Sequence, residues 1–120
     1  AARLEEGSLN TLGVHALGAS LKLLLRVGPA AVWGAIEALT GMLVEGLSQR
    51  GCSIVSPRGA GQTSGIVCFR HPAIPSEAMV RRLAEAGIVA ADRAGAVRLS
   101  PHFYNDVDDV NAVLDVVQRA

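Results

Sequence analysis

The sequence has 120 residues, with 11 basic and 11 acidic side chains and an apolar share of 50%. This length suffices for one domain with a modest hydrophobic core and is too short for two. Because the formal net charge is zero, the charge gives no reason to expect nucleic acid or an anionic membrane surface as a partner.

A long first helix is predicted at the start of the chain. It begins after Ser8 or Asn10, either of which can cap it with a side-chain oxygen, and runs to about Arg26. Leucines and alanines occupy two of its faces, and a helix that is apolar on two faces is buried on two sides. We therefore expect it to form an interface with a neighbouring domain, a partner subunit, or both.

A second helix is predicted from Pro29 to about Arg50, with one apolar stripe and Gly51 as its C-cap glycine. It contains the most apolar stretch of the chain. Because Glu37 and Glu45 interrupt that stretch, we do not expect it to span a membrane.

Short strands and helices alternate in the remainder of the chain. Ser76 is expected to cap a third helix, and Asn105 is expected to cap the last one. Strands are predicted over residues 53–55, 66–69, 88–91 and 96–99, with residues 92–95 joining the last two in a hairpin. The fold class is therefore α+β: a small, mostly antiparallel sheet covered on one face by helices and preceded by a long interface helix. We expect a single domain over 1–120, in which 1–28 form the leading segment and interface helix and 29–120 the α+β body.

An arginine lies inside the last apolar strand. Strand alternation places Arg98 and Ser100 on one side and Val97 and Leu99 on the other. A guanidinium in that position must meet an anion or remain exposed, and its planar fork suits a carboxylate. The alternative is a surface arginine on an edge strand, which residue type alone favours.

The segment from Arg98 to Asn105, Arg-Leu-Ser-Pro-His-Phe-Tyr-Asn, is followed by Asp109-Val110. It resembles the closing motif of class V aminotransferases, a family that includes cysteine desulfurases, kynureninases and isopenicillin-epimerase-like proteins. That motif has an arginine, a small residue two places on, a Tyr-Asn pair and an acidic helix start. The resemblance implies that Arg98 binds the α-carboxylate of an amino-acid substrate.

Two further stretches carry the same resemblance. Residues 5–13, Glu-Glu-Gly-Ser-Leu-Asn-Thr-Leu-Gly, resemble the family's Glu-x-Gly-Thr-Pro-Asn stretch, whose hydroxyl reaches the pyridoxal-phosphate group of the partner subunit in a dimer. By this resemblance Ser8 binds the cofactor phosphate, although Leu9 replaces the usual proline; the alternative is that Ser8 only caps the helix. Residues 64–69, Ser-Gly-Ile-Val-Cys-Phe, resemble the family's Ser-Gly-Ile-Val-Ser-Phe strand.

The sequence also departs from the family pattern. Residues 92–96 contain no cysteine where cysteine desulfurases carry their nucleophile, which disfavours persulfide chemistry. The only lysine, Lys22, lies outside the family's Ser-x-His-Lys-type context for the Schiff-base lysine. Cys52 and Cys68 lack metal-ligand spacing, so we expect buried, reduced thiols and no metal site.

The resemblance therefore implies the C-terminal small domain of a longer, homodimeric, cytoplasmic pyridoxal-phosphate enzyme that acts on an amino acid. Separated from the large domain that carries the lysine, it is expected to be inactive. The other hypothesis is a free-standing, non-catalytic α+β module for dimerisation or ligand binding. Arg93, in the predicted turn, is interpreted as an exposed turn arginine, with a second positive charge at the mouth of a cleft as the alternative.

Overall fold

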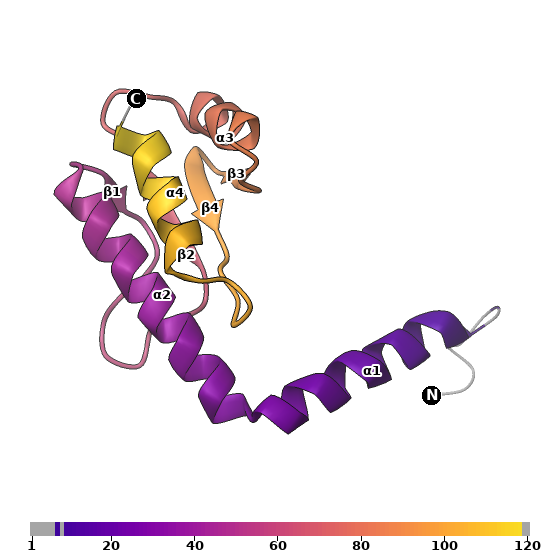
Figure 1. The fold of residues 1–120 in the computed structure, drawn as a ribbon. Helices are drawn as coiled ribbons and strands as arrows, with labels where there is room; N and C mark the ends of the chain where they lie inside the picture. The colour runs from indigo at the N-terminus through magenta and orange to yellow at the C-terminus, as the bar shows by residue number, and fades with distance from the viewer. Residues whose placement is uncertain (1–6, 8, 119–120) are drawn as a thin grey trace. The chain divides into compact units, whose positions relative to one another are not determined.

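The computed structural model of the chain describes Gly7 and residues 9–118 (Figure 1). The chain divides into two compact units, residues 1–32 and 33–120. Helix α1 (Thr11–Val27) belongs to the first unit, and helix α2 (Pro29–Gln49) begins there and continues into the second. All four strands and the two remaining helices belong to the second unit, so the sheet and its core can be treated as one body.

Helix α1 is bounded by two of the predicted signals. The Asn10 side chain accepts a hydrogen bond from the Gly13 backbone N–H at 2.9 Å, so Asn10 serves as the cap. The helix ends at Gly28, whose φ of 92° suits glycine. None of its residues is buried, and Leu12 is 80% exposed. A helix with so much exposed apolar surface has the character of an interface element.

The sheet of the second unit has four strands in the order β1-β2-β4-β3, and each neighbouring pair is antiparallel. This confirms the predicted α+β class. The strands are β1 (Ser53–Ile54), β2 (Val67–Arg70), β3 (Ala91–Arg93) and β4 (Ala96–Leu99). Strand β4 is hydrogen-bonded on both sides, to β2 and to β3, so it is not an edge strand.

Helices supply the other side of the core. One face of the sheet is fully covered, with Val67, Phe69 and Val97 all at 0% exposure. The covering side chains come from α2, from α3 (Ser76–Glu85) and from α4 (Val107–Gln118). The Leu114 side chain of α4 lies against Gly46 of α2, and a Cβ added at Gly46 would collide with it.

Helix α2 is long and apolar enough, by length and composition alone, to cross a membrane. Its two glutamates therefore do not exclude a span, contrary to the sequence argument. Six of its residues are nevertheless buried within the protein, and three of these, Leu39, Leu43 and Leu47, belong to the hydrophobic core; the six are Ile36, Leu39, Thr40, Leu43, Gly46 and Leu47. Burial of one helix face against a sheet is typical of a core helix.

Two predicted caps are wrong. Ser76 is the first residue of α3, and its hydroxyl donates to the Asp92 carboxylate instead of capping the helix. The cap of α4 is Asp106, one residue after the predicted Asn105: its Oδ1 accepts from the Asp109 N–H at 3.1 Å, while Asp109 Oδ2 accepts from the Asp106 N–H at 3.2 Å. This reciprocal pair has the geometry of a capping box, which frees Asn105 for the preceding loop.

Strand β3 lies later in the sequence than predicted. It covers residues 91–93, where 88–91 was expected, because the hairpin turn is only two residues long. Ala94 and Gly95 both have positive φ, 51° and 72°. Two such residues form the tight turn whose twist matches antiparallel strands. Residues 88–90 consequently lie before the strand.

Candidate functional site

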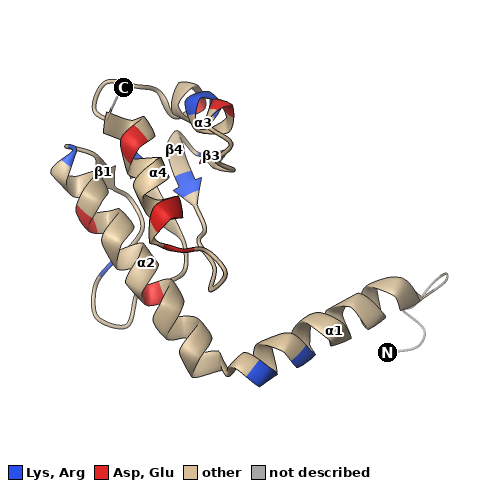
Figure 2. Ribbon diagram, in the orientation of Figure 1, with Lys and Arg blue, Asp and Glu red and all other residues tan. Residues whose placement is uncertain are grey.

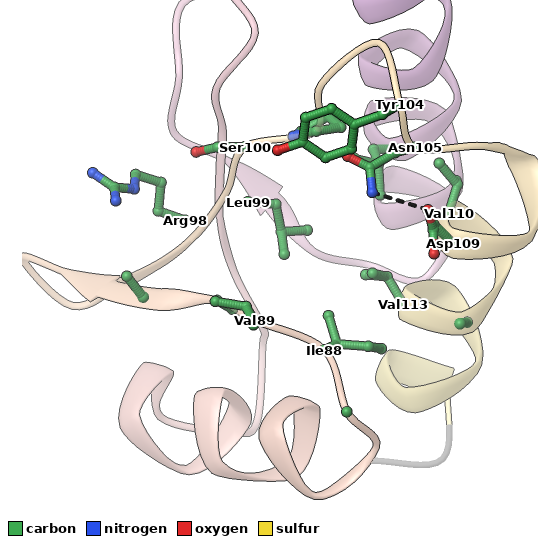
Figure 3. Close-up of a pocket in the computed structure, with 16 residues that line it drawn as sticks. Ile88, Val89, Arg98, Leu99, Ser100, Tyr104, Asn105, Asp109, Val110 and Val113 are labelled. Atoms are coloured by element: carbon green, nitrogen blue, oxygen red, sulfur yellow. Dashed lines mark hydrogen bonds between the residues drawn. The ribbon is translucent and has the colours of Figure 1, made fainter. Parts of the chain in front are cut away.

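Arg98 lies at the centre of the sheet. Its Cα pairs with that of Cys68 on β2 and that of Ala91 on β3. The side chain is half-buried, whereas its neighbours Val97 and Leu99 are 0% and 4% exposed. Figure 3 shows Arg98 extending away from Leu99 and from the side chains of α4. The predicted alternation is confirmed, and the alternative of an edge-strand arginine is wrong.

The guanidinium of Arg98 has no protein acceptor among the residues that the structure describes. Side-chain hydrogen bonds in this part of the chain engage other arginines, namely Arg50, Arg58 and Arg70. Acidic side chains lie mainly on the helices (Figure 2). On the strands, Asp92 is turned toward the Ser76 hydroxyl of α3 and therefore faces the covered side. A half-buried cation without a partner is a suitable anion anchor.

The loop after β4 is held in one conformation by Asn105. Its Oδ1 accepts from the His102 backbone N–H at 2.9 Å, and its Nδ2 donates to Asp109 at 2.9 Å. The Asn105 hydrogen bond, together with that from the Asp106 backbone N–H, lowers the pKa of the Asp109 carboxyl. Asn105 thus connects the loop to the first turn of α4.

Aromatic rings pack along the same loop. The rings of His102 and Tyr104 stack at 5.0 Å with an interplanar angle of 23°, and the Phe103 ring lies 4.9 Å from His102. Tyr104 is 76% exposed. The His102 Nδ1 is buried without a hydrogen-bond partner. This cluster fixes the shape of the loop beside the strand that carries Arg98.

A hollow of about 530 Å³ opens between the segment before β3, the end of β4 and α4. Its walls are mainly apolar, with Ile88, Val89, Leu99, Val110 and Val113 among them (Figure 3). Val89 is 96% exposed. The volume lies in the range of small-molecule sites, and Arg98 is among the residues that line the hollow, with its side chain directed away from the apolar walls.

Sequence reasoning missed the surroundings of Arg98. Arg70, at the end of β2, donates from Nε to the Gly95 carbonyl at 3.1 Å and from Nη2 to the Ala94 carbonyl at 3.3 Å. It therefore ties β2 to the β3–β4 turn. Cys68 lies directly opposite Arg98 and is only half-buried, whereas Cys52 is buried as predicted. Strand alternation in β2 puts Cys68 and Arg70 on the same face. That they lie beside Arg98 follows only once the register between β2 and β4 is known.

The other predicted site residue, Ser8, lies outside the described residues. Lys22 is exposed on α1. Among the described residues no group of histidine, cysteine or carboxylate side chains could hold a metal ion. Burial raises the pKa of the Cys52 thiol, an effect that Arg50 partly offsets, so this thiol stays protonated and is a poor nucleophile.

Comparisons with known proteins identify the family of the chain and relatives of its fold. A model of the aminotransferase class-V family matches residues 1–113. The chain belongs to the class V aminotransferase family. Over 117 residues it is 25% identical to YcbU, an uncharacterized aminotransferase of Bacillus subtilis (strain 168); the match covers 98% of this chain and 31% of that protein.

Solved structures share the fold. The apo structure of a cysteine desulfurase from Thermococcus onnurineus NA1 matches with a TM-score of 0.90 and 24% identity, covering 98% of this chain and 32% of that one. A NifS-like protein matches with a TM-score of 0.81 and 21% identity, covering 95% and 34%. The chain thus spans about a third of the length of these relatives. Enzymes of this family in general use pyridoxal phosphate.

Proposed function

We propose that this chain is the C-terminal small domain of a longer pyridoxal-phosphate enzyme that acts on an amino acid, and that Arg98 binds the substrate carboxylate. The family match and the one-third coverage of the relatives support the first part. The second part, carboxylate binding by Arg98, rests on one observation: its half-buried guanidinium lies in the middle of the sheet without an acceptor among the described residues.

Arg98 is suited to this role by rigidity as well as charge. Its backbone is held by strands on both sides, so little backbone entropy remains to be lost when a ligand binds. A guanidinium can donate two parallel hydrogen bonds to a carboxylate, which fixes the orientation of the substrate as well as its position. The ordered loop from Ser100 to Asn105 would border that substrate.

The described residues do not fit the cofactor itself. Pyridoxal phosphate is attached through a lysine amine, and the only lysine, Lys22, is exposed on α1. Attachment of the cofactor is therefore assigned to a large domain outside this chain, and the chain alone is proposed to be inactive. Ser8 remains our candidate for a hydroxyl that reaches the cofactor phosphate across a dimer.

The exposed apolar side chains of α1 support an interface role in the longer enzyme. Leu12, Leu17 and Leu25 are 60–80% exposed, and apolar patches of this kind are usually covered by another protein surface. We propose the large domain and a second subunit as the covering surfaces, in a homodimer located in the cytoplasm, where the two free thiols would remain reduced.

The test is kinetic and uses the full-length enzyme. Arg98→Met should raise KM for the amino-acid substrate by about 10- to 100-fold, the cost of losing hydrogen bonds to a charged group, while the absorbance of bound cofactor is unchanged. Arg82→Met removes the same charge from the exposed surface of α3 and should have no effect. Unchanged KM and kcat in Arg98→Met would remove the carboxylate assignment.

The same exposed α1 also favours a second candidate, a free-standing module that dimerises through this helix. Sedimentation of the 120-residue chain separates the two. A free-standing module predicts one discrete dimer, which Leu17→Glu converts to monomer. A small domain without its large domain predicts heterogeneous association through the uncovered helix.

A further inference from the structure

Three arginines share the face of the sheet opposite the core, a surface formed by Cys68, Arg70, Ala91, Arg93, Ala96 and Arg98 and termed here the arginine face. The pairing register places them. Cys68, Arg98 and Ala91 form one row across the strands, and Arg93 is paired with Ala96 in the next row. Arg70 follows two residues after Cys68 on β2, so strand alternation puts it on this face as well.

Arg98 therefore has an arginine as diagonal neighbour on each side. Diagonal partners in antiparallel strands lie about 7–8 Å apart at Cα, within reach of long side chains. The position between Arg70 and Arg93 is occupied by Ala96, a small residue that is only 2% exposed. Its low exposure means that neighbouring side chains cover this methyl group, and no larger side chain stands between the two arginines in that row; the Arg70 guanidinium itself is directed to the carbonyl groups of the turn.

The charge of this face is not neutralised within the described part of the chain. The acceptors of Arg70 are the carbonyl oxygens of Ala94 and Gly95, which carry no net charge. Arg93 is exposed and has no described acceptor. The one acidic residue on the strands, Asp92, alternates to the opposite side and bonds Ser76. Like charges at this spacing repel one another, so a ligand that brings two negative charges gains more than one that brings a single charge.

We propose that the arginine face is a binding site for a dianionic ligand, in which Arg98 takes one carboxylate and Arg93 takes the second anionic group. Arg70 is a positioning residue, because its two hydrogen bonds hold the turn that directly follows Arg93. Resting on the proposed function above, this assigns the substrate class: an amino acid with a second anionic group on its side chain.

The test needs no cofactor and uses the chain as it stands. Glutarate carries two carboxylates, and its half-amide, glutaramate, has nearly the same size but only one. Binding of each is followed by NMR through the arginine Nε–H signals and the Cys68 backbone amide. We expect glutarate to bind at least about ten-fold more tightly than glutaramate, the gain from a second charge-assisted pair, with an affinity that falls as salt is added.

Four variants assign the contributions. Arg93→Met should lower the affinity for glutarate to that of glutaramate and leave glutaramate unchanged. Arg98→Met should weaken both ligands. Arg82→Met, which removes an equal charge on α3, should change neither. Folding of each variant is checked by its amide spectrum, and Arg93→Lys should restore part of the preference for glutarate.

The outcomes separate this inference from the proposed function. Equal binding of the two ligands, or a glutarate preference that Arg93→Met leaves intact, overturns the dianion site while the Arg98 assignment stands. Failure of Arg98→Met to weaken either ligand removes the proposed carboxylate anchor as well. Absence of glutarate binding at millimolar concentration also overturns the inference.

Discussion

The two faces of the central sheet differ in burial and in the kind of side chain that they present. On the covered face, Val67, Phe69, Val97 and Leu99 are at most 4% exposed and pack against three helices. On the opposite face the same two strands present Cys68, Arg70 and Arg98, which are half-buried or exposed. Alternation along a strand thus places stabilising residues and the residues proposed to bind a ligand one position apart.

Because of this separation, side chains on the arginine face can be substituted without loss of the fold. Apolar burial contributes most of the favourable free energy of folding, and it is concentrated in the residues facing the helices. Arginines on the other face contribute little burial, so the fold does not require these side chains to be arginines. Substitutions on the covered face should therefore mainly lower stability. Substitutions on the arginine face should mainly weaken the proposed ligand binding and leave stability nearly unchanged.

The largest effect on stability is expected from Phe69→Ala. Phe69 is fully buried in the core, and removal of such a ring costs about 3–5 kcal/mol. Arg98, on the opposite face of the sheet, offers the contrast: Arg98→Met should change the free energy of unfolding by no more than about 0.5 kcal/mol. Urea denaturation measures both. A similar loss in the two variants would contradict the division between the faces.

A smaller loss is expected where the loop after β4 enters α4, a helix of the covered face. Asp106→Ala removes the cap whose Oδ1 accepts from the Asp108 and Asp109 backbone N–H groups, at a cost of about 1 kcal/mol. Asp106→Asn keeps an acceptor oxygen and should lose much less. Equal destabilisation by both variants would show that charge, and not capping, governs the start of the helix.

A gain is expected in the hairpin beside Arg93. Ala94 has a φ of 51°, a conformation that glycine adopts without strain and in which other residues lose about 1–2 kcal/mol. Part of the relief is offset by the greater freedom of glycine in the unfolded chain. Ala94→Gly should therefore stabilise the protein by about 0.5–1 kcal/mol in thermal denaturation, and a drop in stability would refute the positive-φ turn.

The smallest expected effect concerns pH. The Asn105 amide and the Asp106 N–H hold the pKa of Asp109 below its ordinary value. A carboxyl with a lowered pKa in the folded state contributes stability above its unfolded pKa of about 3.9 and loses that contribution as pH falls through the folded pKa. In Asn105→Ala the pKa of Asp109 should rise toward the ordinary value, which NMR titration of the carboxyl carbon detects. If the pKa of Asp109 does not change, Asn105 is not the main cause of the lowered pKa.

Local sequence patterns predicted much of this fold because they depend on few residues. The apolar stripe of α2, the cap at Asn10 and the alternation around Arg98 all follow from short spacings. The errors arose where neighbouring residues compete for one role. Asp106 and Asn105 can both cap a helix, and only the reciprocal bond with Asp109 selects Asp106.

The sequence alone did not predict which residues pair across neighbouring strands. Nothing in the local pattern of β2 says that Cys68 lies opposite Arg98, or that Arg70 reaches the turn at Ala94 and Gly95. The central position of β4 depends on the sheet order, which the chain order does not predict. The arginine face therefore emerges only when register and topology are known.

The most direct test of the account is a crystal structure of the full-length enzyme with a bound substrate analogue that carries an α-carboxylate. We expect both carboxylate oxygens to lie about 2.7–2.9 Å from nitrogens of the Arg98 guanidinium. A carboxylate held by other residues, with Arg98 directed into solvent, would contradict it.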